Sequence, residues 1–242
     1  MKYLTLANRV ITAILLEIII TIIDLLGSMN TKDWKPSRKA GAVKANRELI
    51  LVKAQNYPRD KVGIIGFGTR AEILHEPVCL SQGAESLSNT LSSLPDMGYT
   101  NFKAALELAE ACLFGKAIPS TAGYFGKGLS GFFSQLLYGP VRSTETHIKE
   151  DASNKDCLRR IIMLSDGGYN EGGSPFKVAQ RLKDAGVIVD TIGIGKREDI
   201  NEEAMKRIAS CNPDGTVRYC WIGDEQNLIR KYESLAHHIR PA

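Results

Sequence analysis

Four oxygen-bearing side chains stand where the chain leaves a predicted strand or enters a predicted helix. Asp24 ends an isoleucine-rich run and Ser28 follows it, Asp166 ends the run IIMLS, and Thr100 precedes a helix. Two carboxylates and two hydroxyls, with no imidazole or thiolate, suit a hard cation such as Mg²⁺. We expect these three loops to converge on one site. The alternative is that both aspartates cap their loops by accepting hydrogen bonds from backbone amides.

The elements that must position these residues follow from the alternation of strand and helix patterns. It predicts an α/β fold: a Rossmann-like, doubly wound, mostly parallel six-stranded sheet with helices on both faces. The connection at 68–70 is too short for a crossover, so the strand after it should be an antiparallel edge strand. If strands 17–24 and 158–165 are neighbours, the four side chains open into one crevice at the switch point. The predicted strands are 17–24, 61–68, 71–78, 157–165, 187–193 and 217–222, and the predicted helices are 37–55, 83–91, 101–113, 175–185, 201–210 and 225–239.

The chain of 242 residues is predicted to be one domain with two additions. The domain spans residues 17–242, preceded by an apolar N-terminal extension at 1–16 and interrupted by an aromatic and glycine-rich insertion at 115–157. A connection as long as this insertion is uncommon unless it has its own structure or role. It is either a short amphipathic helix lying on the domain or a docking surface for a partner or a membrane.

The apolar stretch from residue 4 to residue 26 raises the question of a membrane span. Arg9, Glu17 and Asp24 interrupt it, which argues against a spanning helix. No small-residue cleavage site follows, so a signal peptide also fits poorly. We therefore expect a packed extension and a cytoplasmic protein. Membrane association through residues 1–16 or 115–157 is the alternative.

Composition excludes several classes of function. The net charge of +4 is spread over many side chains, so no nucleic-acid partner is expected. The five cysteines form no CxxC pair, which is typical of buried thiols in a reducing compartment. The glycines of the G-x-G-x-x-G at 126–131 follow no strand, and the four histidines form no HExxH. No nucleophile has a base that the sequence places beside it, so we expect no enzyme.

The stretches that carry these oxygen donors resemble von Willebrand factor A (vWA) domains. The metal-ion-dependent adhesion site (MIDAS) of that family reads Asp-x-Ser-x-Ser, then a Thr, then an Asp. IIDLLGSM (22–29), MGYTNFKAALELA (97–109) and IIMLSDGGYNEGG (161–173) are similar to these three elements in the right order. KVGIIGFGTRAEIL (61–74) and AGVIVDTIGIG (185–195) are similar to intervening strands. The resemblance implies a metal site at Asp24, Ser28, Thr100 and Asp166.

One departure from the family pattern falls inside the site. Aligned on Asp24, the first MIDAS serine becomes Leu26, and only the second is kept, as Ser28. In the family both serines and the threonine bind metal directly, whereas the aspartates act largely through water. Water can replace the lost ligand because Mg²⁺ keeps several waters. We therefore expect Mg²⁺, or Mn²⁺, to bind with an affinity that Leu26 weakens.

The function that the resemblance implies is protein binding, with an acidic group of the partner completing the coordination of the cation. Some intracellular members work beside AAA-type ATPases, and that is the first partner class expected. Two alternatives stay open: a metal-assisted phosphoryl or ester hydrolase using Asp24 and Asp166, and a metal-free scaffold that binds through residues 115–157.

Overall fold

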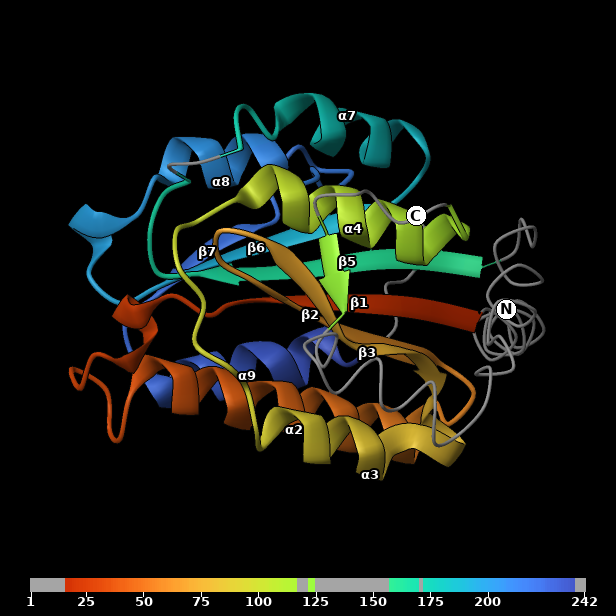
Figure 1. The fold of residues 1–242 in the computed structure, drawn as a ribbon. Helices are drawn as coiled ribbons and strands as arrows, with labels where there is room; N and C mark the ends of the chain where they lie inside the picture. The colour runs from red at the N-terminus through yellow and green to blue at the C-terminus, as the bar shows by residue number, and fades with distance from the viewer. Residues whose placement is uncertain (1–15, 117–121, 125–156, 170–171, 238–242) are drawn as a thin grey trace, which may run out of the picture.

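A twisted seven-stranded sheet divides the protein into two layers of helices (Figure 1). The structure is a computed structural model that describes residues 16–116, 122–124, 157–169 and 172–237. The strand order is β4-β3-β2-β1-β5-β6-β7, which places the first strand at the centre. The strands are β1 (Leu16–Asp24), β2 (Lys61–Phe67), β3 (Ala71–Cys79), β4 (Ala122–Tyr124), β5 (Cys157–Ser165), β6 (Ile188–Ile194) and β7 (Tyr219–Ile222).

Strand β1 is central because both of its faces are apolar. It pairs in parallel with β2 on one side and with β5 on the other, and Ile19, Ile22 and Ile23 are fully buried. Continuous β-branched runs of this kind belong to strands that helices cover on both faces. From β1 the chain moves outward through β2 and β3, and later returns to build β5, β6 and β7 on the opposite side. The gap between β1 and β5 is therefore a topological switch point.

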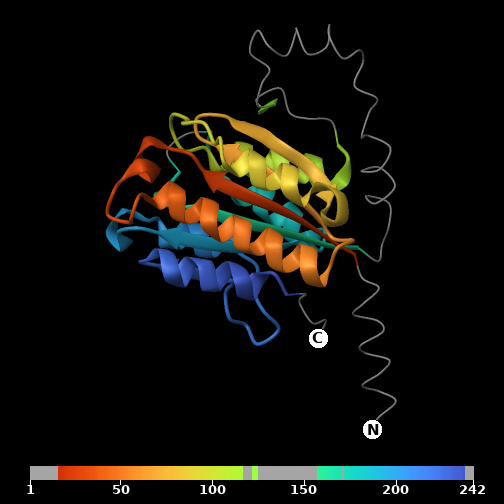
Figure 2. The ribbon, with the colours of Figure 1, turned by 90° about the horizontal axis from the view of Figure 1, so that it is seen from below.

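Helices pack on the two faces of the sheet and give each face its own core. One layer holds α4, α7 and α8, and the other holds α2, α3 and α9. Figure 2 shows the second layer from outside, with α2 lying along the sheet beside α9. The helices are η1 (Gly27–Asn30), α2 (Arg38–Asn56), α3 (Leu80–Leu91), α4 (Phe102–Phe114), α7 (Phe176–Asp184), η2 (Arg197–Asp199), α8 (Glu202–Ile208) and α9 (Glu225–Leu235).

The predicted fold class is confirmed, with one addition. All six predicted strands are present, and β3 runs antiparallel to β2. A short seventh strand, β4, pairs with Ala71–Ile73 of β3, so β3 is not the outermost strand along those residues. Between Lys116 and Cys157, the structure describes only the three residues of β4. The roles predicted for residues 1–15 and for the rest of the insertion lie outside the described residues.

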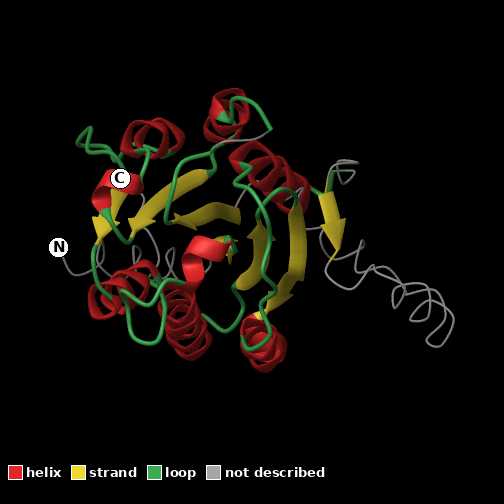
Figure 3. Ribbon diagram, turned by 60° about the vertical axis from the view of Figure 1, so that its left-hand side comes forward, coloured by secondary structure: helices red, strands yellow, loops and turns green. Residues whose placement is uncertain are grey.

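Two further features bear on the sequence analysis. Within the described ranges, no helix is long and apolar enough to cross a membrane. All five cysteines are free thiols. Figure 3 is turned so that the C-terminal edge of the parallel strands comes forward, and loops gather along this edge. The residues predicted to bind metal lie in loops at this edge.

Candidate metal centre

Asp24 is the last residue of β1, and its carboxylate is fully buried at the C-terminal edge of the sheet. One oxygen accepts a hydrogen bond from the backbone N–H of Leu26 at 3.1 Å, and the other accepts one from the Ser165 hydroxyl at 2.6 Å. Burial, and to a smaller extent the nearby charge of Asp166, raises the pKa of Asp24 to about 7, although these hydrogen bonds oppose the shift. An opposite charge placed beside this carboxylate would therefore be strongly favoured.

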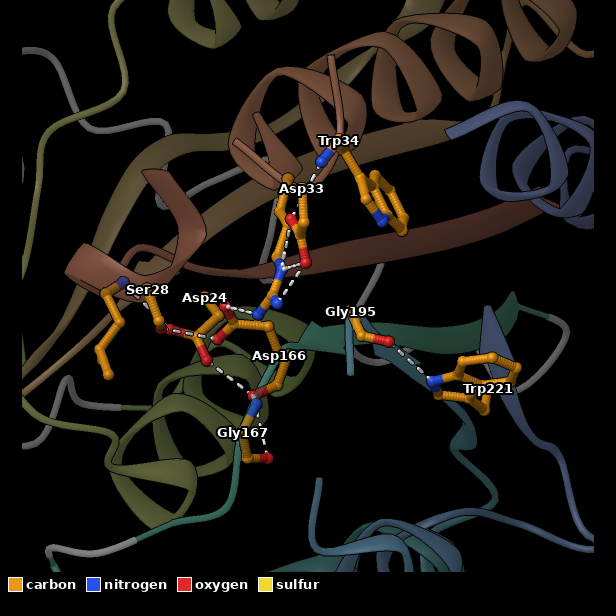
Figure 4. A network of polar contacts seen from close by, with 11 residues as sticks. Asp24, Ser28, Asp33, Trp34, Asp166, Gly167, Gly195 and Trp221 are labelled. Carbon is orange, nitrogen blue, oxygen red and sulfur yellow. Dashed lines mark hydrogen bonds and ion pairs between the residues drawn. The ribbon is translucent and has the colours of Figure 1, made fainter. Parts of the chain in front are cut away.

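Asp166 follows β5 directly and faces the same place from the neighbouring strand. It is 2% exposed. Its Oδ1 accepts a hydrogen bond from the Ser28 hydroxyl at 2.9 Å, and its Oδ2 accepts one from Nη1 of Arg38 at 2.9 Å (Figure 4). Burial raises the pKa of Asp166, although Ser28 and Arg38 oppose the shift. The bonds from Ser28 and Ser165 tie the β1 and β5 loops together.

The loop that carries Thr100 is fixed to the β1 loop and to the turn between β2 and β3. The N–H of Met97 donates to the carbonyl of Leu25 at 2.7 Å, and the N–H of Asn101 donates to the carbonyl of Gly68 at 3.0 Å. Asn101 also caps α4 through its side chain, which accepts a hydrogen bond from the N–H of Ala104. Thr100 itself is 1% exposed. The three predicted loops therefore meet at one edge of the sheet.

The donor set of this site fits a hard cation. Ser28 uses its single hydroxyl hydrogen on Asp166, so the lone pairs of its oxygen stay available to a metal. Among the described residues no group of three or more His, Cys, Asp or Glu side chains could hold a metal. A cation here would rest on two carboxylates, two hydroxyls and water. The role of Asp24, Ser28, Thr100 and Asp166 as ligands stays a prediction.

Leu26 lies half-buried in the same loop, directly before η1. Its backbone N–H donates to Asp24, and its side chain carries no oxygen. That Leu26 stands in place of the first MIDAS serine stays a prediction. By sequence position, no other residue of the β1 loop takes the place of the first MIDAS serine. Water is the ligand that remains available there.

Arg38 is the site residue that the sequence analysis missed. A basic residue in an amphipathic helix is most simply assigned to its solvated side, yet Arg38 is 3% exposed and contacts Asp166. Its Nε also donates to Asp33 at 3.0 Å. One signal pointed to it: a cation in the first turn of a helix opposes the helix dipole, so it needs a nearby carboxylate.

The rim of the site is aromatic and charged. Tyr99, beside Thr100, is 62% exposed, and Trp221 is 39% exposed. Trp221 donates its indole N–H to the carbonyl of Gly195, close to the site (Figure 4). The exposed basic side chains at this edge are Lys32, Lys35, Arg70, Lys196 and Arg197, and the exposed acidic ones include Asp33, Asp96, Glu198 and Asp199. The rim therefore carries charges of both signs beside its aromatic side chains.

Comparisons with known proteins agree with this architecture. A family model described as von Willebrand factor type A domain matches residues 19–168, and a second model of the same description matches residues 141–225. The chain is 36% identical over 55 residues to the uncharacterized protein YabS of Bacillus subtilis (strain 168), which covers 23% of this chain and 22% of that protein.

Two solved structures share the fold. The proximal thread matrix protein 1 of the mussel byssus, with a zinc-occupied MIDAS motif, has a TM-score of 0.63 at 18% identity, over 92% of this chain and 47% of that one. BatB of Bacteroides thetaiotaomicron has a TM-score of 0.58 at 21% identity, over 91% of this chain and 98% of that one. The chain thus spans under half of the mussel protein and about a fifth of YabS.

With a family model matching most of its length, a central β1 flanked by β2 and β5, and the three loops meeting at one edge, the chain belongs to the von Willebrand factor type A domain family.

Proposed function

We propose that this domain binds a protein partner through a divalent cation held by Asp24, Ser28, Thr100 and Asp166. The observation that carries the proposal is the pair of hydrogen bonds from Ser165 to Asp24 and from Ser28 to Asp166. They bring two buried carboxylates and a hydroxyl to the switch point of the sheet. Mg²⁺ or Mn²⁺ is the proposed cation because every donor is an oxygen.

The chemistry of such a site is attraction between charges. A cation coordinated partly by neutral hydroxyls keeps enough charge to attract a carboxylate of the partner. Among the charges of both signs at the rim, the exposed lysines and arginines favour the same acidic surface, and Tyr99 offers an apolar contact beside Thr100. An AAA-type ATPase is the partner class proposed first, in the cytoplasm.

Titration of Mg²⁺ and Mn²⁺ into the purified chain by calorimetry tests the metal site. We expect saturable binding that Thr100→Ala weakens by about tenfold or more, because one direct oxygen ligand is lost. The matched control is Thr90→Ala on α3, whose hydroxyl donates to the carbonyl of Ser86. Equal affinity in wild type and Thr100→Ala would contradict the proposed ligand set.

Partner binding is tested by immobilising the wild-type chain in Mg²⁺ and eluting with EDTA. The proposal predicts a partner that EDTA releases, that excess glutamate-containing peptide displaces, and that Thr100→Ala fails to retain. A partner held equally in EDTA and lost on deletion of residues 120–140 would favour the metal-free scaffold. Divalent-dependent turnover of phosphate esters, abolished by Asp24→Ala, would favour the hydrolase.

A further inference from the structure

A built-in cation already sits in the proposed metal centre. The guanidinium of Arg38 contacts Oδ2 of Asp166 at 2.9 Å, and the side chains of the pair are 4% and 1% exposed. Arg38 comes from the first turn of α2, where a positive charge opposes the helix dipole. Its contacts with carboxylates are therefore what holds it at this position.

The surroundings of Arg38 are shaped to receive it. Asp33 accepts hydrogen bonds from Nε and Nη2 on the side away from Asp166, and this contact lowers the pKa of Asp33. Gly195, with φ +86°, lies so close that a Cβ there would stand 2.4 Å from Cζ of Arg38. Trp221 holds the Gly195 carbonyl through its indole N–H. The guanidinium fits a space that only glycine leaves open.

Asp166 therefore has two candidates for its counter-ion. Both of its oxygens accept hydrogen bonds in the structure, one from Ser28 and one from Arg38. A divalent cation brought to Asp24 and Asp166 would lie close to the guanidinium, and two positive charges repel strongly in a buried site. Asp33 can serve as the counter-ion of the guanidinium in place of Asp166, because the side chain of Asp33 is 30% exposed and already binds Arg38.

We propose that Arg38 and a divalent cation are alternative occupants of the Asp166 carboxylate, so that Arg38 holds the site in a metal-free state and must leave Asp166 when metal binds. The inference rests on the proposed function, because it concerns the affinity of the same site. It makes Arg38 a determinant of metal affinity in addition to Leu26. The charge of Arg38, and not its volume, sets the competition.

Two variants separate charge from shape. Arg38→Gln removes the charge and keeps a hydrogen-bond donor, whereas Arg38→Lys keeps the charge. With Mn²⁺ titrated into the full chain by calorimetry, we expect Arg38→Gln to bind about tenfold or more tightly than wild type, and Arg38→Lys to stay near wild type. Arg47→Gln, on the exposed side of the same helix, controls for net charge and should not change the affinity.

A second measurement uses the wild-type chain, so it does not depend on how the variants fold. The Nε–H signal of Arg38 in a ¹⁵N spectrum, assigned by its loss in Arg38→Lys, should shift on addition of Mg²⁺. The Nε–H signal of Arg160, whose guanidinium contacts Asp190 at 2.7 Å, should stay in place. Thermal unfolding of each variant confirms that it is folded before titration.

The outcomes distinguish this inference from the proposed function. Metal binding with the same affinity in wild type, Arg38→Gln and Arg38→Lys, with an unmoved Arg38 signal, overturns the competition and leaves the metal site standing. An absence of metal binding in wild type, Arg38→Gln and Leu26→Ser overturns both. Tighter binding in Arg38→Gln alone supports the competition.

Discussion

Leu26 places a hydrocarbon side chain in the loop that follows Asp24, the carboxyl group whose pKa is raised by burial. Its backbone N–H donates to Asp24, so the loop keeps its shape whatever side chain stands at this position. The side chain is half-buried and lies in the loop between Asp24 and Ser28.

We expect Leu26→Ser to tighten Mg²⁺ binding because it restores a direct oxygen ligand. Leu26→Ala is the matched control, since it removes the same bulk without adding a donor. Calorimetry should show a gain for serine and none for alanine. Equal gains would mean that bulk, and not the missing ligand, limits the affinity, and no gain would count against the alignment of the first loop.

Asp24 should make the metal-free protein less stable as the pH rises. The pKa of Asp24 rises from an ordinary value of 3.8 to about 7 in the folded chain, so the folded state binds the proton more tightly than the unfolded state. The contribution of Asp24 to the free energy of unfolding is therefore fully present below pH 4, falls as the pH rises to 7, and is constant above 7. The full loss is on the order of 4 kcal/mol.

Asp24→Asn, which does not titrate, should lack this loss. In EDTA, thermal unfolding should show the variant gaining on wild type as the pH is raised from 4 to 7. A difference between the two proteins that does not change with pH would contradict the raised pKa. Asp214→Asn, in an exposed turn, is the control.

At the scale of residues, the sequence predicted that Asp24, Ser28 and Asp166 lie close together, but it did not predict that Arg38 is the cation beside Asp166. Asp24 and Asp166 were predictable because strand ends in a parallel sheet face one edge. The contact of Arg38 with Asp166 spans 128 residues, and helix periodicity assigned Arg38 to the exposed side. Burial of a charge depends on a partner that is distant in sequence, which periodicity does not report.

The loop at 97–101 shows how neighbouring elements hold Thr100 in place. It hydrogen-bonds to Leu25 and Gly68, so Thr100 is positioned by β1 and by the β2–β3 turn as much as by α4. A Cβ on Gly68 would stand 2.4 Å from Cβ of Met97 and 2.9 Å from its carbonyl carbon. The missing side chain of Gly68 allows this approach.

Gly68→Ala should therefore push the loop outward and weaken metal binding several-fold, without changing any ligand. Gly27→Ala is the matched control, because a Cβ at Gly27 meets nothing within 4 Å. Calorimetry with Mn²⁺ measures both. An unchanged affinity in Gly68→Ala would show that Thr100 keeps its place independently of the turn, or that it is not a ligand.

Most elements were predictable because their runs are long and strongly apolar. The boundaries that differ have local reasons. Strand β3 runs to Cys79 and passes straight into α3, which begins at Leu80 and not at residue 83. Strand β4 has three residues, too few to produce a pattern of alternation. Its pairing with β3 is a tertiary contact that sequence periodicity does not contain.

Across the whole molecule, charges are buried at both ends of β1. At the end opposite the candidate metal centre, Lys53 of α2 binds Glu17 and lies 2.6 Å from Asp60, with all three side chains at most 3% exposed. Nearby, Arg160 binds Asp190 at 2.7 Å. Glu17 had served in the sequence analysis only as an argument against a membrane span. Its role in the fold is to anchor α2.

Lys53→Met should destabilise the protein strongly, because it removes the buried cation shared by Glu17 and Asp60 and leaves Glu17 with the longer contact to Arg160, at 3.7 Å. The expected loss is about 3–5 kcal/mol, a fall of roughly 10 °C in melting temperature for a chain of this size. Lys44→Met removes the exposed pair with Glu225, where Lys44 is 50% exposed, and should cost under about 1 kcal/mol. Similar shifts in both variants would contradict the importance of burial.

Helix α2 thus forms buried ion pairs at both ends: Arg38 binds Asp166 of the β5 loop, and Lys53 binds Glu17 at the start of β1. Arg38 and Lys53 are fifteen residues apart, or about 22 Å along the helix axis. If the Arg38 contact is released while the Lys53 contact holds, movement of α2 is confined to its beginning, where Lys39 still bonds to the carbonyls of Leu94 and Pro95. Because Lys44 reaches α9 and Arg47 reaches Ser92, just past the end of α3, such a movement would carry an event at one carboxylate to a whole face of the domain.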